Sequence, residues 1–314
     1  MGRYLVRRAI ISVFTLIAIS IVVFGILAFA PGDPLAEFAA NPNVPAELRD
    51  KIRETMGLND PIPIQYAKWA TAYVQGDWGV SFQTKQPAQD YIFSRIPVTL
   101  KVVGTAFLLG VVIAIPIGVL SALKQYSAFD QIATTFAFIG FSVPTFFSGI
   151  LLIILFSVKL GWLDFVYRSD LQGFWPNVKQ SIMPVTVLAL AGAAQLTRFV
   201  RASMLETIGQ DYVRTARAKG LREQSVVLLH AMRNALIPVV TIIALQVPEI
   251  LGGAIITEQI FRVPGIGSGL IAGIASKDIP VVMAITFGIA ILVVAFNVIA
   301  DILYAVLDPR IRYT

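Results

Sequence analysis

Six long apolar segments constrain the fold of this chain more than any other feature of its sequence. An α-helix of about 20 apolar residues can cross the hydrocarbon core of a bilayer, and each segment reaches about that length. Hydrophobic residues make up 56% of the chain and charged residues only 14%, a composition too apolar for an ordinary soluble domain. We therefore expect an all-α integral membrane protein with six transmembrane helices. The segments lie at about residues 9–30, 98–122, 131–158, 181–205, 236–258 and 281–307.

The first apolar segment could instead be a cleavable signal peptide. Arginines precede it, and Ala28-Phe29-Ala30 has the small-x-small form of a cleavage site. However, the segment is longer than a typical signal-peptide core. Pro31 would also follow the cut directly and would restrict the backbone where a protease needs an extended substrate. We expect a retained transmembrane helix.

Basic residues in short loops predict the orientation, because Lys and Arg are enriched on the cytoplasmic side. Arg3, Arg7 and Arg8 place the N-terminus in the cytoplasm. Six crossings return the C-terminus, with its two arginines Arg310 and Arg312, to the same side. We thus expect a multi-pass protein of the cytoplasmic (inner) membrane, surrounded by the lipid bilayer, with both termini in the cytoplasm.

The first external loop, at about 31–97, has patterns typical of short helices. They are expected at Pro45–Gly57, at Pro61 to about Val74 and at Pro87 to Arg95, each beginning near a proline that suits a first helical turn. These helices could form a cap that merely covers the bundle. They could also form a docking surface or a gate that faces outside.

Several kinds of chemistry have no support in the sequence. It contains neither the G-x-x-x-x-G-K-[ST] loop that cradles nucleotide phosphates nor the G-x-S-x-G signature of acyl transfer. With one histidine and no cysteine, a zinc site would need carboxylates for nearly every ligand. The mild positive charge comes from loop residues and does not indicate nucleic acid. We expect no catalytic site, no metal site and no nucleic-acid partner.

The cytoplasmic segment at about 206–233 has a pattern that suits docking to another protein. Asp211 can cap a short helix, because its carboxylate can accept backbone N–H groups that lack a partner. Gly220 suits the left-handed position that ends a helix, and the apolar stretch Val226–Leu229 then leads to His230 and Arg233 near the end of a second helix. Small residues between them would let a partner's backbone approach closely. An ordinary basic loop attracted to anionic lipid is the alternative.

This segment resembles the cytoplasmic coupling loop of ABC importer permeases, which carries the motif called EAA. The family pattern has Glu-Ala-Ala followed three residues later by Gly, whereas alignment on Gly220 finds Arg-Thr-Ala at 214–216. The usual later Ile-x-Leu-Pro is also replaced, by His230–Ala235 with Pro238 further on. These departures match the branch that imports oligopeptides and dipeptides, with relatives for nickel and glutathione.

Short motifs elsewhere resemble the same branch, so the resemblance runs from end to end of the chain. It is closest to the first of the two permease subunits, the DppB and OppB type. The motifs are RYLVRR at 3–8, PGDP at 31–34, MGLNDP at 56–61, QGDWG at 75–79, FRVPGIG at 261–267 and LDPRIRY at 307–313.

The resemblance implies the type I ABC importer permease fold, as one transmembrane permease domain over residues 1–314. It implies that a homologous second permease subunit, two ABC ATPase subunits and an extracytoplasmic solute-binding protein complete the transporter. ATP and Mg would be bound by the ATPase subunits, so we expect no cofactor on this chain. The implied cargo is a dipeptide or oligopeptide. Nickel chelate, glutathione and an oligosaccharide are alternatives within the same family.

The resemblance further implies that the coupling loop sits in a groove of one ATPase subunit and transmits its movement to the transmembrane helices. Exposed arginines of the loop could pair with acidic groups there. The residues expected at this contact are Arg214, Thr215, Ala216, Arg217, Gly220, His230 and Arg233.

A second candidate site consists of polar residues inside the apolar segments, where such groups usually face a partner or a cavity. Glu249 follows Pro248 and could line the translocation pathway or form a hydrogen bond between helices. Pro144, in the third segment, could act as a hinge or gate or could simply kink its helix. The pathway candidates are Glu249, Gln246, Gln195, Asn297 and Pro144.

Two other classes of function remain as alternatives. A secondary transporter would work without any ATPase, and it predicts interrupted helices at matching positions of two halves, which the sequence does not display. An intramembrane enzyme predicts a nucleophile or a metal-ligand set, and the sequence offers no convincing one.

Overall fold

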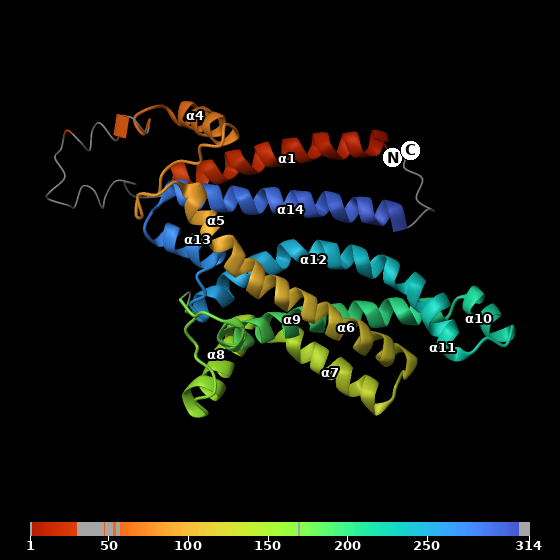
Figure 1. Ribbon diagram of the computed structural model, residues 1–314. Coiled ribbons are helices and arrows are strands. Elements are labelled where there is room, and N and C mark those ends of the chain that lie inside the picture. The colour runs from red at the N-terminus through yellow and green to blue at the C-terminus, as the bar shows by residue number, and fades with distance from the viewer. Residues whose placement is uncertain (1, 30–46, 48–52, 55–56, 169, 308–314) are drawn as a thin grey trace. The chain divides into compact units, whose positions relative to one another are not determined.

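The computed structural model describes residues 2–29, 47, 53–54, 57–168 and 170–307. Over these residues the chain is helical, with one isolated β-bridge between Val80 and Pro87. Five helical stretches are long and apolar enough to cross a membrane, and a pair of helices joined at a sharp bend makes a sixth span if counted together. The prediction of an all-α membrane protein with six transmembrane helices is confirmed (Figure 1).

The spans contain nearly all of the long helices, and three of them include a π-helical turn, labelled η. In chain order they hold α1 (Gly2–Ala28); α5, η1 and α6 (Ala88–Thr99, Leu100–Gly104 and Thr105–Leu123); α7, α8 and η2 (Ala128–Ser142, Thr145–Leu152 and Ile153–Lys159); α9 (Phe174–Ile208); α11, η3 and α12 (Glu223–Ser225, Val226–Met232 and Arg233–Ile260); and α14 (Ile279–Leu307). Outside the spans lie α4 (Ile62–Val74), α10 (Asp211–Ala218) and α13 (Ile266–Ala275).

Pro144 interrupts the third span. A residue that precedes a proline is disfavoured in the α conformation, and Val143 is accordingly extended, with φ −85° and ψ 121°. Helix α7 therefore ends at Ser142, and Pro144 becomes the N-cap of α8. The two halves are bent by 101°, so the proline separates two helices instead of kinking a continuous one.

Two of the three helices expected in the loop at 31–97 are present. Helix α4 confirms the helix expected from Pro61 to Val74. The helix expected to stop at Arg95 is α5, which instead continues through η1 and α6 to Leu123. Pro97 lies inside α5, and the helix continues past it into the π-turn η1. The expected helix at 45–57 lies largely outside the described residues.

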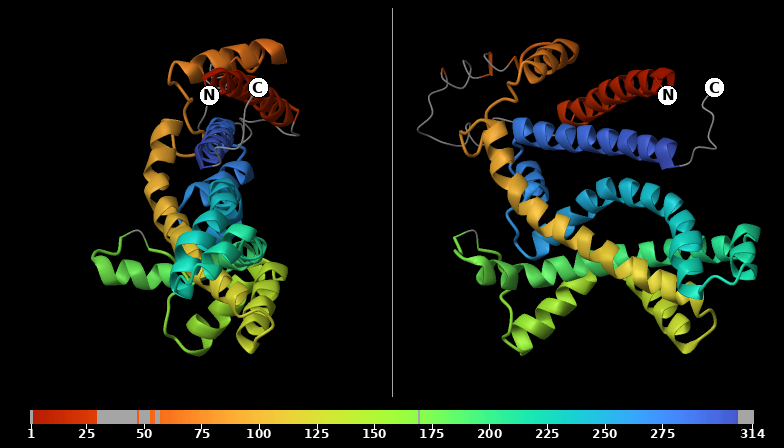
Figure 2. Two further views of the ribbon diagram at one scale, coloured as in Figure 1. Left: turned by 90° about the vertical axis from the view of Figure 1, so that its right-hand side faces the viewer. Right: turned by 45° about the vertical axis from the view of Figure 1, so that its right-hand side comes forward.

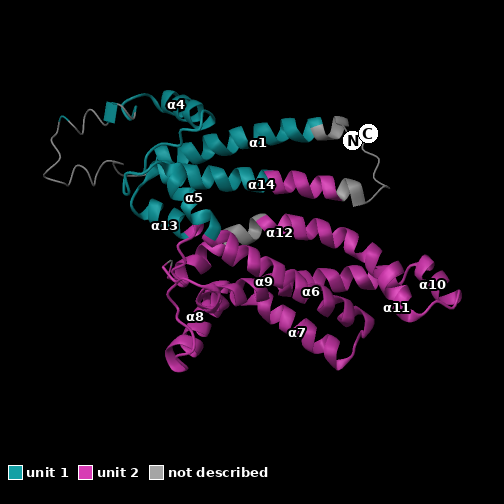
Figure 3. Cartoon of the chain, in the orientation of Figure 1, with its two compact units in different colours: residues 1–97, 268–294 teal, residues 98–267, 295–314 magenta. Residues whose placement is uncertain are grey.

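The contacts within the chain divide it into two compact units (Figure 3). Unit 1 comprises residues 1–97 and 268–294, and unit 2 comprises residues 98–267 and 295–314. Unit 1 contains a cluster of aromatic rings, in which the centroids of neighbouring rings lie 5.0–6.0 Å apart. The rings belong to Phe24, Tyr66, Trp69, Tyr73, Trp78 and Phe287. Burial in this cluster raises the pKa of Tyr73 to about 12.

Unit 2 is built around α9, which packs against α6, α7, α8 and α12 (Figures 1 and 2). The contact with α6 is very close at Gly118. A β-carbon at this position would lie 2.7 Å from Cβ of Val200 and 2.9 Å from the carbonyl oxygen of Thr197. Glycine therefore allows the backbones of α6 and α9 to approach, which is a recurring mode of helix packing in membranes.

We predict that Gly118→Ala lowers the stability of the protein by about 1–3 kcal/mol, because the added methyl group overpacks the contact between α6 and α9. The measurement is the apparent melting temperature of the purified protein in detergent. Gly104→Ala is the matched control. Its β-carbon would meet nothing within 4 Å, so stability should stay equal or rise slightly through helix propensity. Equal melting temperatures for both variants would contradict the close contact.

Candidate functional site

The segment at 211–233 has the helix, glycine turn and second helix expected from its sequence. Helix α10 ends at Ala218, and Gly220 has φ +75°, the left-handed conformation that glycine adopts without strain. Helix α11 and the π-turn η3 follow and lead directly into α12. Figure 2 shows α10 and α11 beside the end of α9, where α12 begins.

Asp211 does not cap α10, contrary to the prediction. Gln210 occupies the N-cap position, with φ −73° and ψ 148°, and its side chain forms no capping bond. Asp211 is instead the first helical residue, and its exposed carboxylate lies 3.6 Å from Nη1 of Arg214. An acidic group in the first turn still stabilises the helix, because it interacts with the positive end of the helix dipole.

One face of α10 is buried inside the protein. Val213 and Ala216 are 0% and 5% exposed and belong to the same apolar core as Val226, Val227 and Ala231 of η3. Ala216 was expected to let a partner approach closely. Its small side chain instead packs within the chain's own core, where it lets α10 and η3 lie close together.

The opposite face of α10 is exposed. It presents Arg214, Thr215 and Arg217, and Gly220 continues it at the turn. Arg217 donates to Glu223 from Nη2 at 2.7 Å and from Nε at 3.2 Å, and this ion pair bridges the Gly220 turn. The carboxylate of Glu223 holds the pKa of Arg217 above its ordinary value.

The two remaining coupling candidates lie at the far end of the segment. His230 is half-buried in η3, and its carbonyl oxygen accepts a bond of 2.9 Å from Nδ2 of Asn234. Arg233 is exposed at the start of α12. The segment thus carries cations at both ends and is anchored by apolar residues between them.

Three of the five pathway candidates line one cavity of about 320 Å³ in unit 2. Pro144 contributes from the break between α7 and α8, Gln195 from α9 and Gln246 from α12. Gln246 is 6% exposed, and no described residue accepts a hydrogen bond from its Nε2 atom. The other lining residues are Gly140, Phe141, Val143, Thr145, Leu188, Ala191 and Gly192.

The other two pathway candidates do not line this cavity. Asn297 is exposed on α14. Glu249 falls within α12, but its side chain lies outside the described part of the structure.

Sequence reasoning missed a buried acidic residue, Glu258, near the end of α12. It is 1% exposed, and its Oε1 accepts a bond of 2.7 Å from Oγ1 of Thr99. Thr99 Oγ1 in turn accepts a bond of 2.8 Å from the backbone N–H of Ile266. Glu258 therefore fixes the turn at Phe261–Gly267. An acidic residue at the end of an apolar segment, directly before that motif, was the available signal.

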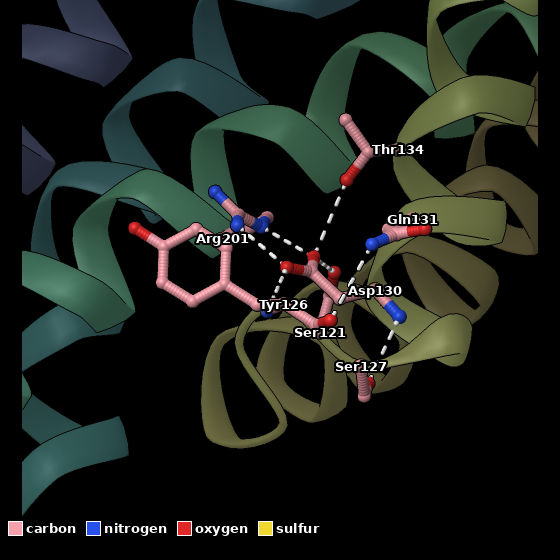
Figure 4. Close-up of polar contacts among 7 residues, drawn as sticks. All are labelled: Ser121, Tyr126, Ser127, Asp130, Gln131, Thr134 and Arg201. Atoms are coloured by element: carbon pink, nitrogen blue, oxygen red, sulfur yellow. Dashed lines mark hydrogen bonds and ion pairs between the residues drawn. The ribbon is translucent and has the colours of Figure 1, made fainter.

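A second missed residue is Asp130, which forms a buried ion pair with Arg201 (Figure 4). Arg201 Nε and Nη2 donate to the two carboxylate oxygens at 2.7 and 2.8 Å. The backbone N–H of Tyr126 donates at 3.0 Å, and Ser121 also bonds to the carboxylate. The network joins α7 to α9. Its available signal was Ser127-x-x-Asp130, a capping pattern before an apolar run.

This arrangement defines a multi-pass membrane protein that combines an anchored, exposed helix with a cavity among its membrane helices that two glutamines line. Residues 114–313 match the family described as binding-protein-dependent transport system inner membrane component. Residues 1–103 match the N-terminal part of such membrane components. The chain therefore belongs to the family of binding-protein-dependent transport system inner membrane components.

Known proteins support this membership along the whole chain. The oligopeptide transport system permease protein AppB of Bacillus subtilis (strain 168) is 43% identical, and all of both chains is covered. The glutathione transport system permease protein GsiC of Escherichia coli (strain K12) is 37% identical, again over all of both chains. A crystal structure of an amino acid ABC transporter with histidines matches 69% of this chain and 94% of its own, at 14% identity and a TM-score of 0.52. This last similarity shows the fold alone.

We predict that Asp130→Asn destabilises the protein by about 3 kcal/mol, because it leaves the charge of Arg201 without its buried partner. Thermal unfolding in detergent measures the change. Asp60→Asn is the control, since it removes an exposed ion pair with Lys68 and should cost at most about 1 kcal/mol. If the two variants unfold at the same temperature, the Asp130 network does not stabilise the fold.

Proposed function

We propose that this chain is a permease subunit of an ATP-driven ABC importer that takes up dipeptides or oligopeptides across the cytoplasmic membrane. The observation that carries the proposal is the 43% identity to an oligopeptide transport system permease over the full length of both chains. Glutathione is the second candidate cargo, because a glutathione transport system permease is 37% identical over the same extent.

In this proposal the chain works within a larger complex. A homologous second permease subunit completes the pathway, two ABC ATPase subunits bind on the cytoplasmic side, and an extracytoplasmic solute-binding protein delivers the cargo. ATP and Mg are bound and turned over by the ATPase subunits. Both termini lie in the cytoplasm, on the same side as the segment at 211–233.

The exposed face of α10 is the proposed contact with one ATPase subunit. Arg214, Thr215 and Arg217 offer positive charge and hydrogen-bond donors there, which suits an acidic groove. Exposed ion pairs add little affinity, so this charge guides association and orients the partner. His230 and Arg233 extend the contact toward the start of α12.

The buried face of α10 explains how such a contact would be transmitted. Val213 and Ala216 share one apolar core with residues of α6, α9, η3 and α12. Close-packed interiors resist compression, so a displacement of α10 would move these helices as a body. ATP can drive the cycle because it binds the two arrangements with different affinity.

The function is tested by isolating the chain from its native membrane in mild detergent and identifying the proteins that accompany it. A second permease, ATPase subunits and a binding protein are expected. Proteoliposomes made from that complex should take up labelled peptide only when ATP is present on the side of the ATPase subunits. Identifying the ligand of the binding protein then decides whether the cargo is a peptide or glutathione. Gradient-driven uptake by the chain alone would identify a secondary transporter and refute the proposal.

We predict that Gly220→Leu uncouples ATP hydrolysis from uptake, lowering transport at least tenfold while the protein still inserts. A side chain at φ +75° strains the turn that orients the exposed face of α10. Gly161→Leu is the matched control, since Gly161 has φ +64° and similarly open surroundings but lies outside the segment. The measurement is the number of cargo molecules imported per ATP hydrolysed, and an equal loss in both variants would remove the coupling assignment.

A further inference from the structure

The lining of the cavity between α7, α8, α9 and α12 does not suit the binding of charged groups. All ten of the described residues that line it are uncharged. Its volume of about 320 Å³ lies within the range of small-ligand pockets. Its lining includes two carboxamides, of Gln195 and Gln246, and Phe141, Val143 and Leu188 supply apolar surface.

Gln246 is the polar group of this cavity that lacks a partner among the described residues. Its side chain is 94% buried, and its Nε2 donor has no acceptor there. Burying an amide donor without a hydrogen bond is unfavourable, so such a group indicates that an acceptor arrives from elsewhere. Gln246 lines the cavity, but Nε2 itself is not accessible to water in the structure, so a cargo atom in the cavity becomes its acceptor once the side chain turns toward the cavity during transport.

The chemistry of a carboxamide limits what that cargo atom can be. A glutamine side chain is neutral, and its Nε2 donates hydrogen bonds, so it pairs with a carbonyl oxygen without requiring a counter-charge. Peptide bonds supply such carbonyls at regular intervals whatever the side chains are. An ammonium group or a metal ion would instead require anionic or several oxygen ligands, and no carboxylate is found among the described residues of the lining.

We infer that Gln246 donates a hydrogen bond from Nε2 to a backbone carbonyl of the peptide in transit, and that this cavity recognises the peptide bond and not the side chains or the charged termini. This inference rests on the proposed function. The apolar wall of Phe141, Val143 and Leu188 accommodates varied side chains, and Pro144 lines the cavity at the bend between α7 and α8.

The test compares a peptide that the complex imports with an analogue in which an (E)-alkene replaces one peptide bond. The analogue keeps the shape but has no carbonyl, and each bond of the peptide is replaced in turn. The measured quantity is the ratio of kcat/KM for peptide and analogue in the reconstituted transporter. Any preference of the binding protein enters equally for every permease variant, so it cancels when variants are compared.

Gln246→Met keeps the length of the side chain but removes its donor. In this variant the ratio of kcat/KM for peptide and analogue should fall roughly three- to tenfold when one particular peptide bond is the one replaced, which is the effect expected of one neutral hydrogen bond. Thr241→Val is the control. Its buried Oγ1 on α12 also lacks a partner among the described residues, but Thr241 does not line the cavity, so the wild-type ratio is expected.

If Gln246→Met has the same ratio as the wild type whichever peptide bond is replaced, the inference is overturned, and the proposal of a peptide importer still stands. If that variant is poorly produced, Gln246→Leu provides the same comparison, and an unchanged ratio there also overturns it. A wild-type complex that imports no peptide with ATP refutes the proposed function itself. The two failures are therefore distinguishable.

Discussion

The close approach of α6 and α9 is the contact on which unit 2 depends. Lipid is as apolar as leucine, so membrane helices gain little from covering apolar side chains and rely on tight packing of small residues. Gly118 meets Val200, and at Gly110 a β-carbon would lie 3.3 Å from the carbonyl oxygen of Ala189. The two helices therefore meet along much of their length, and α9 is left with other faces for α7, η3 and α12.

Because α9 is the common support, the segment at 211–233 and the cavity belong to one packed body. Val200 and Met204 share the apolar core that buries Val213 of α10, while Gln195 of the same helix lines the cavity. The ion pair of Arg201 with Asp130 fixes α7 to α9 near the same end. A rigid helix that carries both would supply a physical connection between the proposed ATPase contact and the proposed passage of cargo, without a long chain of separate side-chain contacts.

The sequence predicted the features that depend on local pattern. Apolar length predicted the spans, and glycine predicted the left-handed turn at 220. It could not tell which way the small residue Ala216 faces, since a small side chain suits both a partner and an internal core. It also missed Asp130 and Glu258, because their partners Arg201 and Thr99 lie 71 and 159 residues away. Pro144, Gln195 and Gln246 were each identified, but only tertiary structure brings them to one cavity.

The buried polar groups of unit 2 differ in a way that separates support from recognition. Asp130 and Glu258 are ionisable, and a buried charge is tolerated only when partners compensate its lost hydration. Asp130 has such partners in Arg201, Ser121 and the backbone N–H of Tyr126. Gln246 is neutral, so a missing partner costs far less, and the group can remain without one beside a cavity. A transport pathway also requires binding weak enough to release its cargo. A carboxamide meets that requirement, whereas a buried charge in the same place would bind an oppositely charged group too strongly to let it pass.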